Sequence, residues 1–401
     1  VAALRKARAA HSMAPSRIRI YAAAAALPLA LALVAPPART APPRTFVRRH
    51  GIDVNVWEYV YNNQDPGVPL PAGCDERNPT PAPFEITSEQ KEELEREGVV
   101  VIPGLLDQEW LTHLREITDW QVEHPHIWAS PGVASGLYDY IQRNIWTTND
   151  AFIKFLYHSP VSTALAQLGG AKDSVRVTTD LLMVNPNKGF KRHQDNQNGP
   201  VGFDNALRWW VTMDDSPKDY GAPVYLRKSQ NNKCVPEDAV FVDIDEGDLP
   251  EYHDFTSFRP KAGDLIVWHA RTIHKIDGPT SQDWGSNKRR VLGGTVAIDD
   301  ATYVDKEKVE FADMGRHSLK HGDPLTDPHF PKIWPRPDPA EVVARFNGDV
   351  GRSREGFGRM VGAMFSAKTF EQFASWGNVL KKKNAVEEEE AEVREEVPAS
   401  R

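Results

Sequence analysis

Short runs of β-branched and apolar residues, separated by turn-forming residues, dominate the middle of the chain. Such runs cover residues 174–184, 207–213, 222–226, 261–269 and 289–296. Gly, Pro, Asn and Asp gather between them, and such clusters mark turns between strands. Because these strands do not alternate with long amphipathic helices, the pattern favours two antiparallel sheets over a parallel α/β sheet. We therefore predict a mainly β protein with flanking helices, folded as a double-stranded β-helix (a jelly roll, cupin-like).

Two helices are predicted ahead of these strands. Thr87 and Gln90 have the spacing of a capping box, and the acidic helix that follows ends at Gly98. Asp107 is a suitable N-cap for the second helix. The apolar stripe of that helix consists of Leu111, Leu114 and Ile117. We expect both helices to pack on the outside of the barrel as scaffold.

A metal-binding pattern occurs among the predicted strands. His193 and Asp195 are separated by one residue, so on a strand both side chains point to one face, while Gln194 points to the other. His274 follows on a later strand, and Arg289 lies beyond it. Two His and one carboxylate on one face of an Fe(II) ion leave open positions, which oxygen activation requires. The pattern therefore indicates a non-haem iron oxygenase.

The His-x-Asp pattern alone is weak, because roughly one such triplet is expected by chance in a chain of this size. A second triplet, residues 321–323, lies between Lys320 and Pro324, where Gly and Pro indicate a loop. No later His follows it as a suitable partner. We interpret this second triplet as a chance match.

Several segments occur in the order typical of one protein family. They are residues 84–90 (FEITSEQ), 97–106 (EGVVVIPGLL), 193–195 (HQD), 263–269 (GDLIVWH) with His274, 322–325 (GDPL) and 330–335 (FPKIWP). Together they resemble the phytanoyl-CoA dioxygenase (PhyH)-like family of Fe(II)/2-oxoglutarate-dependent oxygenases, over about residues 84–335. The segment 226–230 (LRKSQ) departs from the Pro-Gly-Ser-His turn of many relatives, which affects the shape of a loop rather than the metal site.

The resemblance implies a role for each of the pattern's residues. His193, Asp195 and His274 would be the iron ligands and therefore the catalytic residues. Arg289 would bind the far carboxylate of 2-oxoglutarate, a task that suits a guanidinium because it binds carboxylates bidentately and stays charged.

Two alternatives remain open at this point. The segment between His274 and Arg289 is longer than expected for the family, so Arg290 is also a candidate for the carboxylate-binding residue. Only one of these arginines can face the barrel interior, because side chains alternate along a strand. His269 competes with His274 as a ligand, but it ends an apolar strand, where a packed histidine is the commoner outcome.

Asp195 also bears on the reaction. Relatives that halogenate replace this carboxylate by a small residue, so its presence favours hydroxylation. The resemblance implies that O2 and 2-oxoglutarate are converted to succinate and CO2 while a C–H bond of a small-molecule or acyl substrate is hydroxylated. Ascorbate is a candidate reductant. The substrate itself is not predicted, because substrate-selecting loops vary most within the family.

Other classes of function are kept beside this one. A jelly-roll protein that binds a metal or a small ligand without turnover would be favoured if any of the four site residues lay elsewhere. A cupin-type metal enzyme, such as an isomerase or hydrolase, would not use 2-oxoglutarate and would not need Arg289.

Composition limits the partners. The chain has 401 residues and a net charge of −8, yet its first fifty residues contain nine Lys or Arg and no Asp or Glu. The remainder is therefore strongly acidic, which excludes nucleic acid as the main partner. The cysteines, Cys74 and Cys234, could form one disulfide, but they are too few for a disulfide framework and free thiols are expected.

The predicted organisation has four parts. Residues 1–49 form a targeting segment or membrane anchor, 50–83 an extended arm, 84–380 the dioxygenase domain and 381–401 a charged, disordered tail. The Ala/Leu-rich run at 20–35 is short and interrupted by Pro. It indicates a cleaved segment for the secretory pathway, the endoplasmic reticulum or another organelle. The alternative is a single anchor, which would bring the protein to a membrane. The sequence does not predict the oligomeric state.

Overall fold

The structure is a computed structural model. It describes residues 46–49, 52–55, 66–72, 74, 84–126, 129, 136, 138–195, 200–216, 221–232, 244–245, 247, 249, 254–279, 288–304, 319–326 and 329–338. The predicted targeting segment up to residue 45, the predicted tail and Cys234 lie outside these residues, whereas Cys74 carries a free thiol. In the part of the chain that the structure describes, no helix has the length and apolar character needed to span a membrane.

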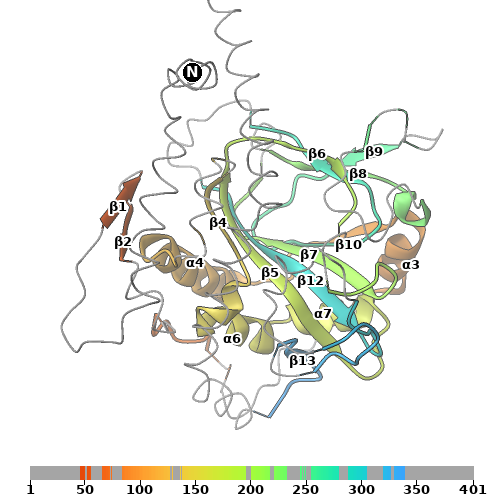
Figure 1. Cartoon of the computed structure of the whole chain (residues 1–401), viewed down its shortest axis with the longest axis horizontal. Coiled ribbons are helices and arrows are strands. Elements are labelled where there is room, and N and C mark those ends of the chain that lie inside the picture. Colours follow the sequence, from red (N-terminus) through yellow and green to blue (C-terminus); the bar gives the residue numbers. More distant parts are fainter. Residues whose placement is uncertain are drawn as a thin grey trace, which may run out of the picture. The chain divides into compact units, whose positions relative to one another are not determined.

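The larger of the two main sheets is antiparallel and has the strand order β13-β5-β12-β7-β10-β3. Its strands are β3 (Val99–Ile102), β5 (Val175–Pro186), β7 (Ala206–Thr212), β10 (Leu265–His269), β12 (Arg290–Ile298) and β13 (Lys332–Trp334). A further strand, β4 (Tyr138–Arg143), pairs with residues 181–186 of β5. The long antiparallel pairing of β5 with β12 forms the middle of this sheet (Figure 1).

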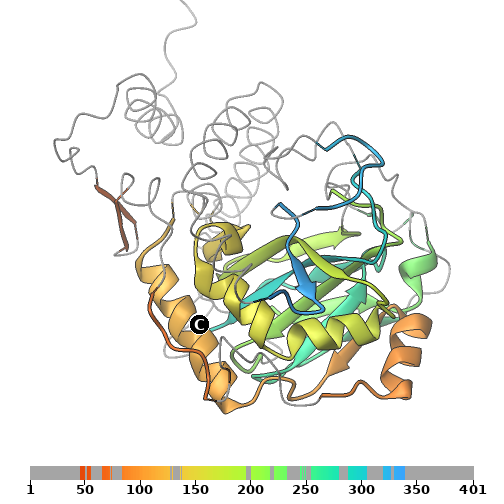
Figure 2. The same cartoon turned by 90° about the horizontal axis from the view of Figure 1, so that it is seen from below.

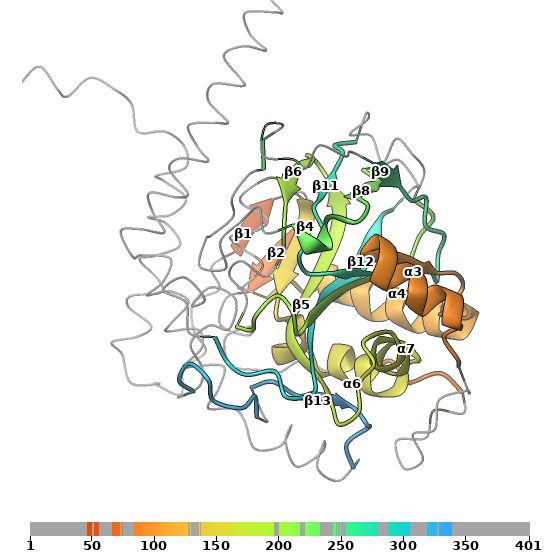
Figure 3. The same ribbon diagram turned by 90° about the vertical axis from the view of Figure 1, so that its right-hand side faces the viewer.

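The smaller sheet has the order β6-β11-β8-β9 and is also antiparallel. Its strands are β6 (Phe190–His193), β8 (Pro223–Leu226), β9 (Phe255–Ser257) and β11 (His274–Ile276). Figures 1 and 3 show this sheet on the far side of the barrel from α6 (Asp150–His158) and α7 (Val161–Leu168). Two antiparallel sheets with few helices confirm the predicted jelly roll.

Alternation along the strands divides the core into an inner and an outer part. On β7, Trp209 belongs to the outer cluster of buried residues and Trp210 to the inner cluster. The inner cluster takes residues from both sheets, including Tyr225 and Ile276 from the smaller one. The two sheets therefore enclose a common interior, as period-two patterning predicts.

Helices cover the outer face of the larger sheet, as Figure 2 shows. They are α3 (Ser88–Glu97), α4 (Gln108–Glu123), α6 (Asp150–His158) and α7 (Val161–Leu168). The predicted capping box of Thr87 and Gln90 is present, and Gly98 ends α3 with φ of 77°, which favours glycine. Asp107 caps α4. The predicted stripe of α4 lies in the outer core.

Shorter elements complete the described fold. Two single-turn 3₁₀ helices are η2 (Ile145–Thr147) and η3 (Ser229–Asn231). Ahead of the barrel, β1 (Phe46–Arg49) and β2 (Ile52–Asn55) pair as an antiparallel hairpin. Neither the 3₁₀ helices nor the hairpin was predicted from the sequence.

Candidate metal centre

The three predicted ligands meet where β6 ends and β11 begins. His193, the last residue of β6, is paired with His274, the first residue of β11, and their rings are 4.3 Å apart. One nitrogen or oxygen atom from each of His193, Asp195 and His274 lies within 4.8 Å of the others. Across the described ranges, this is the single group of three His, Cys, Asp or Glu side chains arranged to hold a metal.

The strand ends earlier than the His-x-Asp prediction assumed. Asp195 lies two residues beyond β6, and its backbone N–H donates to the carbonyl of Ala270 (2.9 Å). Gln194 points away from the ligands, and its amide donates to the carbonyls of Asn232 (2.7 Å) and Arg271 (2.6 Å). The chain therefore stays extended past the strand, and the side chains on either side of Gln194 still share one face.

Hydrogen bonds to backbone carbonyls orient both imidazoles. The Nδ1 atom of His193 lies 2.7 Å from the carbonyl oxygen of Lys191. The Nδ1 atom of His274 lies 2.9 Å from the carbonyl oxygen of Thr272. A carbonyl can only accept, so each Nδ1 carries the proton and each Nε2 presents a lone pair. This is the tautomer that a metal-binding histidine needs.

Two residues that sequence analysis missed hold Asp195. Arg208 Nε and Trp268 Nε1 each donate to its Oδ2 atom at 3.0 Å. Arg208 also donates to the Thr295 hydroxyl, and its guanidinium lies 5.7 Å from the Trp268 ring. Because both donors use Oδ2, Oδ1 is the oxygen left for a metal. From the alternation of side chains along β7, sequence analysis could have predicted that Arg208 faces the interior, as Trp210 does. It could not have predicted the contact with Asp195.

Charge and burial keep both kinds of ligand in the form that binds metals. Burial raises the pKa of Asp195, but charge interactions, that with the Arg208 guanidinium foremost, outweigh it and hold the pKa well below its usual range. Burial, followed by the neighbouring His274, lowers the pKa of His193 to about 4. At neutral pH, Asp195 is therefore a carboxylate and His193 a neutral imidazole, which is the state that metal binding requires.

The donor set fits a divalent metal ion. The Nε2 of His274 lies 3.1 Å from Oδ2 of Asp195, and the Nε2 of His193 lies 3.7 Å from Oδ1. Lone pairs that face one another at such distances repel unless a cation lies between them. Atoms bound to one metal at about 2.1 Å are roughly 3 Å apart, close to these separations. Two His and one carboxylate with open positions suit Fe(II).

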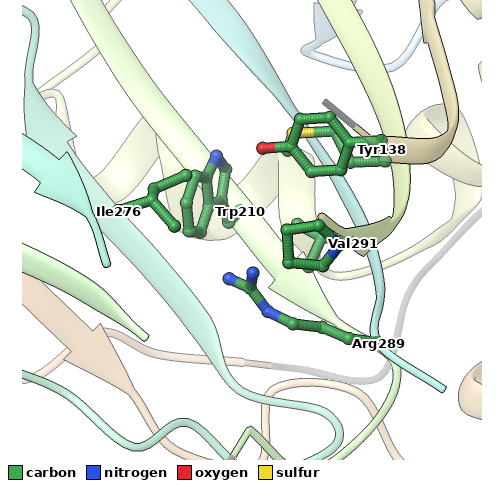
Figure 4. A pocket seen from close by; sticks show the side chains of 7 residues that line it. Tyr138, Trp210, Ile276, Arg289 and Val291 are labelled. Carbon is green, nitrogen blue, oxygen red and sulfur yellow. The ribbon is translucent and has the colours of Figure 1, made fainter. Parts of the chain in front are cut away.

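Arg289 lies in a pocket of the barrel interior. The pocket is lined by Tyr138, Met183, Pro186, Trp210, Ile276, Arg289 and Val291. Figure 4 shows the guanidinium of Arg289 and the hydroxyl of Tyr138 pointing into this pocket, beside the indole of Trp210. The guanidinium lies 5.9 Å from the Trp210 ring. Tyr138 is buried, and this burial raises its pKa to about 12, so its hydroxyl stays protonated.

The environment of Arg289 suits an anionic ligand. Its side chain is 4% exposed, and its Nε has no hydrogen-bond partner among the described residues. Burial lowers the pKa of its guanidinium, which reflects the cost of keeping this charge away from water. A buried guanidinium is stabilised when a carboxylate binds to it.

Arg290 faces the other way. Its guanidinium donates to both carboxylate oxygens of Asp214 (3.0 and 2.6 Å) and to Asp119 of α4 (2.9 Å). These contacts lie on the outer side of the sheet, so Arg289 is the one of the two arginines that faces the interior.

The other residues considered from the sequence do not join this site. His269 ends β10, and its Nδ1 accepts a hydrogen bond from the backbone of Arg271 (3.2 Å). In the second His-x-Asp triplet, Asp323 accepts from the backbone N–H of Lys320 (2.7 Å), as expected for a loop. Neither His269 nor the second triplet belongs to the metal-binding group.

Comparison with protein families matches residues 94–290 to the family described as Phytanoyl-CoA dioxygenase (PhyH). This match confirms the predicted resemblance over a shorter range than residues 84–335. Together with the His-Asp-His set it supports an Fe(II)/2-oxoglutarate-dependent oxygenase, with iron and 2-oxoglutarate as its metal and cosubstrate. A search of curated protein sequences found no match.

Solved structures of low sequence identity resemble this chain in fold. One is the epimerase SnoN from nogalamycin biosynthesis, in complex with Fe3+, alpha ketoglutarate and nogalamycin RO. Its TM-score is 0.50 at 19% sequence identity, and the match covers 61% of this chain and 97% of SnoN. The carbocyclase SnoK from the same biosynthesis has a TM-score of 0.49 at 21% identity, over 62% and 96%. EctD from S. alaskensis with bound Fe has a TM-score of 0.46 at 16% identity, over 61% and 89%. The SnoN comparison supports the jelly-roll fold and nothing finer.

Proposed function

We propose that this PhyH-like oxygenase hydroxylates an unactivated C–H bond of a small-molecule or acyl substrate and releases succinate and CO2. His193, Asp195 and His274 would bind the Fe(II), and Arg289 the far carboxylate of 2-oxoglutarate. The observation that carries the proposal is the convergence of a complete His-Asp-His set in a barrel that also holds a buried arginine. Asp195 favours hydroxylation over halogenation because its carboxylate would occupy the position on the metal that a halide would take if this residue were small.

Each side chain has a definable task in this proposal. Iron and 2-oxoglutarate, when bound, supply the chemistry that activates O2. His193 and His274 present lone pairs that their carbonyl partners hold in place, and Asp195 presents Oδ1 while Arg208 and Trp268 occupy Oδ2. Arg289 fixes the direction of the cosubstrate. The apolar walls of the interior exclude water from the reacting groups.

The outcome of the reaction is the part most in need of a test. SnoN is named an epimerase and SnoK a carbocyclase, so proteins of similar fold bring about other changes than hydroxylation. The product's composition separates these outcomes. Hydroxylation adds one oxygen atom, ring formation removes two hydrogen atoms, and epimerisation leaves the composition unchanged.

The test is a substrate screen with the full chain, Fe(II), 2-oxoglutarate and ascorbate in air. Small molecules and acyl thioesters are ranked by the succinate release they stimulate, and products are examined by mass spectrometry under ¹⁸O2. We expect a product that gains one labelled oxygen atom in step with succinate. A product of unchanged composition, or one that has lost two hydrogen atoms, would replace the hydroxylase proposal with an epimerase or cyclase.

The N-terminal address is a separate proposal. We propose that residues 1–49 direct the chain to the secretory pathway or another organelle. The alternative is that this segment is retained as a membrane anchor. Its basic composition, without Asp or Glu, supports a targeting role. Fusion of residues 1–49 to a fluorescent protein tests it. Release of a processed, soluble reporter inside an organelle is expected, and a diffuse cytosolic reporter would contradict the proposal.

A further inference from the structure

The hydroxyl of Tyr225 is a buried polar group without a partner among the described residues. Tyr225 lies on β8, a strand with every position buried, and its side chain is 0% exposed. Its hydroxyl has no hydrogen-bond partner within the described part of the chain. Buried tyrosine hydroxyls usually have a partner, because an unpaired one costs the free energy of its lost hydration. A missing partner in the barrel interior points to a bound molecule.

The position of Tyr225 places this hydroxyl beside the metal centre. Tyr225 is directly opposite His274 in the pairing of β8 with β11. Its ring stacks on the His274 imidazole, with centroids 5.6 Å apart and planes at 22°, and it lies 5.4 Å from the Trp268 ring. Trp268 is itself a hydrogen-bond donor to Asp195. The Tyr225 side chain therefore packs against one predicted ligand and against a residue that holds another.

The packing around Tyr225 relates it to both parts of the site. Its ring stacks on His274, one of the predicted ligands. It also belongs to the inner cluster with Trp210, which lines the pocket of Arg289. The chain that leads into β8 approaches the same pocket, because a Cβ atom at Gly221 would lie 3.2 Å from Nη1 of Arg289. Tyr225 therefore lies in the part of the interior that the predicted metal ligands and the Arg289 pocket share. A cosubstrate that is bound to the metal at one end and to Arg289 at the other must occupy this space.

We propose that the Tyr225 hydroxyl binds the cosubstrate and donates a hydrogen bond to its metal-proximal carboxylate. The inference rests on the proposed function of the site, and it adds a binding group that the sequence did not indicate. Arg289 would fix the far carboxylate in the pocket of Figure 4, while Tyr225 fixes the near one. Two separate contacts would set both the position and the direction of the molecule before O2 binds.

The test measures binding rather than turnover. The full chain is loaded with Fe(II) without oxygen, and the affinity for 2-oxoglutarate is compared with that for 2-oxobutyrate, which has the same metal-binding end but lacks the far carboxylate. Tyr225→Phe removes the hydroxyl and keeps the ring. We expect this variant to bind both ligands about tenfold more weakly, by the same factor, because one hydrogen bond to a charged acceptor is lost at the shared end.

Tyr140→Phe is the matched control. Tyr140 is also 0% exposed, but its hydroxyl lies in the outer core, where it donates to Gln142 (2.6 Å) and accepts from Gln121 (3.2 Å). This variant should melt at a lower temperature and bind both ligands as the wild type does. Without cosubstrate, Tyr225→Phe should melt at or above the wild-type temperature, because the variant lacks an unpaired polar group. When cosubstrate is added, its melting temperature should rise less than that of the wild type.

Several results would overturn the inference. Equal affinities in the wild type and Tyr225→Phe would mean that the hydroxyl has another partner, such as a water molecule. A loss confined to 2-oxoglutarate would place the hydroxyl at the far carboxylate. A clear drop in the melting temperature of Tyr225→Phe without cosubstrate would indicate a structural hydrogen bond. If the wild type binds Fe(II) but neither ligand, the proposed function fails, and the inference fails with it.

Discussion

Asp195 is the residue at which most of the site's interactions meet. Arg208 and Trp268 bind its Oδ2, and both predicted histidine ligands lie within 3.7 Å of one of its oxygens. The Arg208 and Asp195 side chains are only 12% and 13% exposed. Removing one partner of such a pair leaves the other charge buried and uncompensated. Asp195 is therefore held in place by this chain's own residues and not by a metal alone.

Loss of Arg208 should destabilise the protein most when no metal is bound. We expect Arg208→Gln to lower the free energy of unfolding by about 3 kcal/mol in metal-free protein, because the buried Asp195 loses its counter-charge. A divalent metal supplies another positive charge, so the loss should shrink when Co(II) is added. Denaturant unfolding with and without Co(II) measures both values.

Arg227 offers the matched control for this experiment. It pairs with Asp254 at 4.0 Å, and the two side chains are 36% and 44% exposed. Arg227→Gln should change the free energy of unfolding by less than about 1 kcal/mol, with or without metal. Equal losses for Arg208→Gln in the presence and absence of Co(II) would contradict the role given to Arg208.

The depressed pKa of His193 predicts a loss of stability in acid. The folded state protonates His193 near pH 4, whereas the unfolded chain does so near its ordinary value of 6.5. Between these values the unfolded state binds more protons, so stability falls as the pH drops from 6.5 to 4. The contribution is about 3 kcal/mol, from the size of the shift.

A comparison of wild type and His193→Gln isolates this contribution. Both are unfolded with urea in the metal-free state at several pH values between 7 and 4. The wild type should lose more stability than the variant across this range, and the two stability curves should be closest to parallel at its upper end, near pH 7. Parallel curves throughout would show that His193 titrates alike in the folded and unfolded chains.

At the scale of elements, β12 positions Arg289 and Arg290 on opposite faces of the sheet. Arg290 is bound to Asp214 and Asp119 outside the barrel, which leaves the preceding residue directed inward. Further along β12, Gly293 lies against Trp210, the ring beneath the Arg289 guanidinium. The start of this one strand therefore sets the geometry of the pocket.

Gly293→Ala should disturb that pocket. A Cβ atom at Gly293 would lie 2.6 Å from the carbonyl oxygen of Trp209 and closer still to the Trp210 ring, and a backbone oxygen cannot move aside easily. We expect a loss of about 2 kcal/mol or more in the free energy of unfolding, together with weaker 2-oxoglutarate binding. Thermal denaturation and ligand titration measure the two effects.

Gly202→Ala is the control, because a Cβ at Gly202 meets nothing within 4 Å. Its stability should stay within about 0.5 kcal/mol of the wild type. If Gly293→Ala also left stability and 2-oxoglutarate binding unchanged, the close packing of β12 against Trp210 would not determine the shape of the pocket.

How much the sequence predicted differs from one element to the next. The runs that became β5, β7, β10 and β12 were long and apolar enough to be recognised. By contrast, β9, β11 and β13 have only three residues each, too few to show a period. The helices α6 and α7 are buried along most of their length, so no polar face marked them.

The residues of the site likewise divide into those that the sequence predicted and those that it did not. The His-x-Asp pair, His274 and Arg289 were predicted because spacing along the chain or a family resemblance identifies them. Arg208 and Tyr225 were missed because their importance depends on contacts across the barrel, with Asp195 and His274. Pairing between strands distant in sequence cannot be read from local patterning.

At the scale of the whole molecule, the site joins the two sheets. His193 and His274 belong to the smaller sheet, and Arg289 directly precedes β12 of the larger one. A metal and a cosubstrate bound together would connect them. A ligand that binds only the folded state stabilises it by about 2.7 kcal/mol when present at 100 times its Kd.

Bound metal and 2-oxoglutarate should therefore slow hydrogen exchange mainly in the smaller sheet. Its strands β6, β9 and β11 are short, whereas β5 and β12 form a long ladder that needs no ligand. Hydrogen exchange followed by mass spectrometry, with Co(II) alone and with Co(II) plus 2-oxoglutarate, would show this. Protection confined to the larger sheet would place the ligands elsewhere.

The most direct test of the whole account is an anaerobic titration of the full chain with Fe(II) and 2-oxoglutarate, followed through the weak visible charge-transfer absorption of the chelate. The wild type should develop this band, and so should His321→Ala, which alters the second His-x-Asp triplet. Asp195→Ala and Arg289→Ala should lose the band or require far more cosubstrate. Iron binding without a band in the wild type, or an unchanged band in both site variants, would contradict the assignment of this centre.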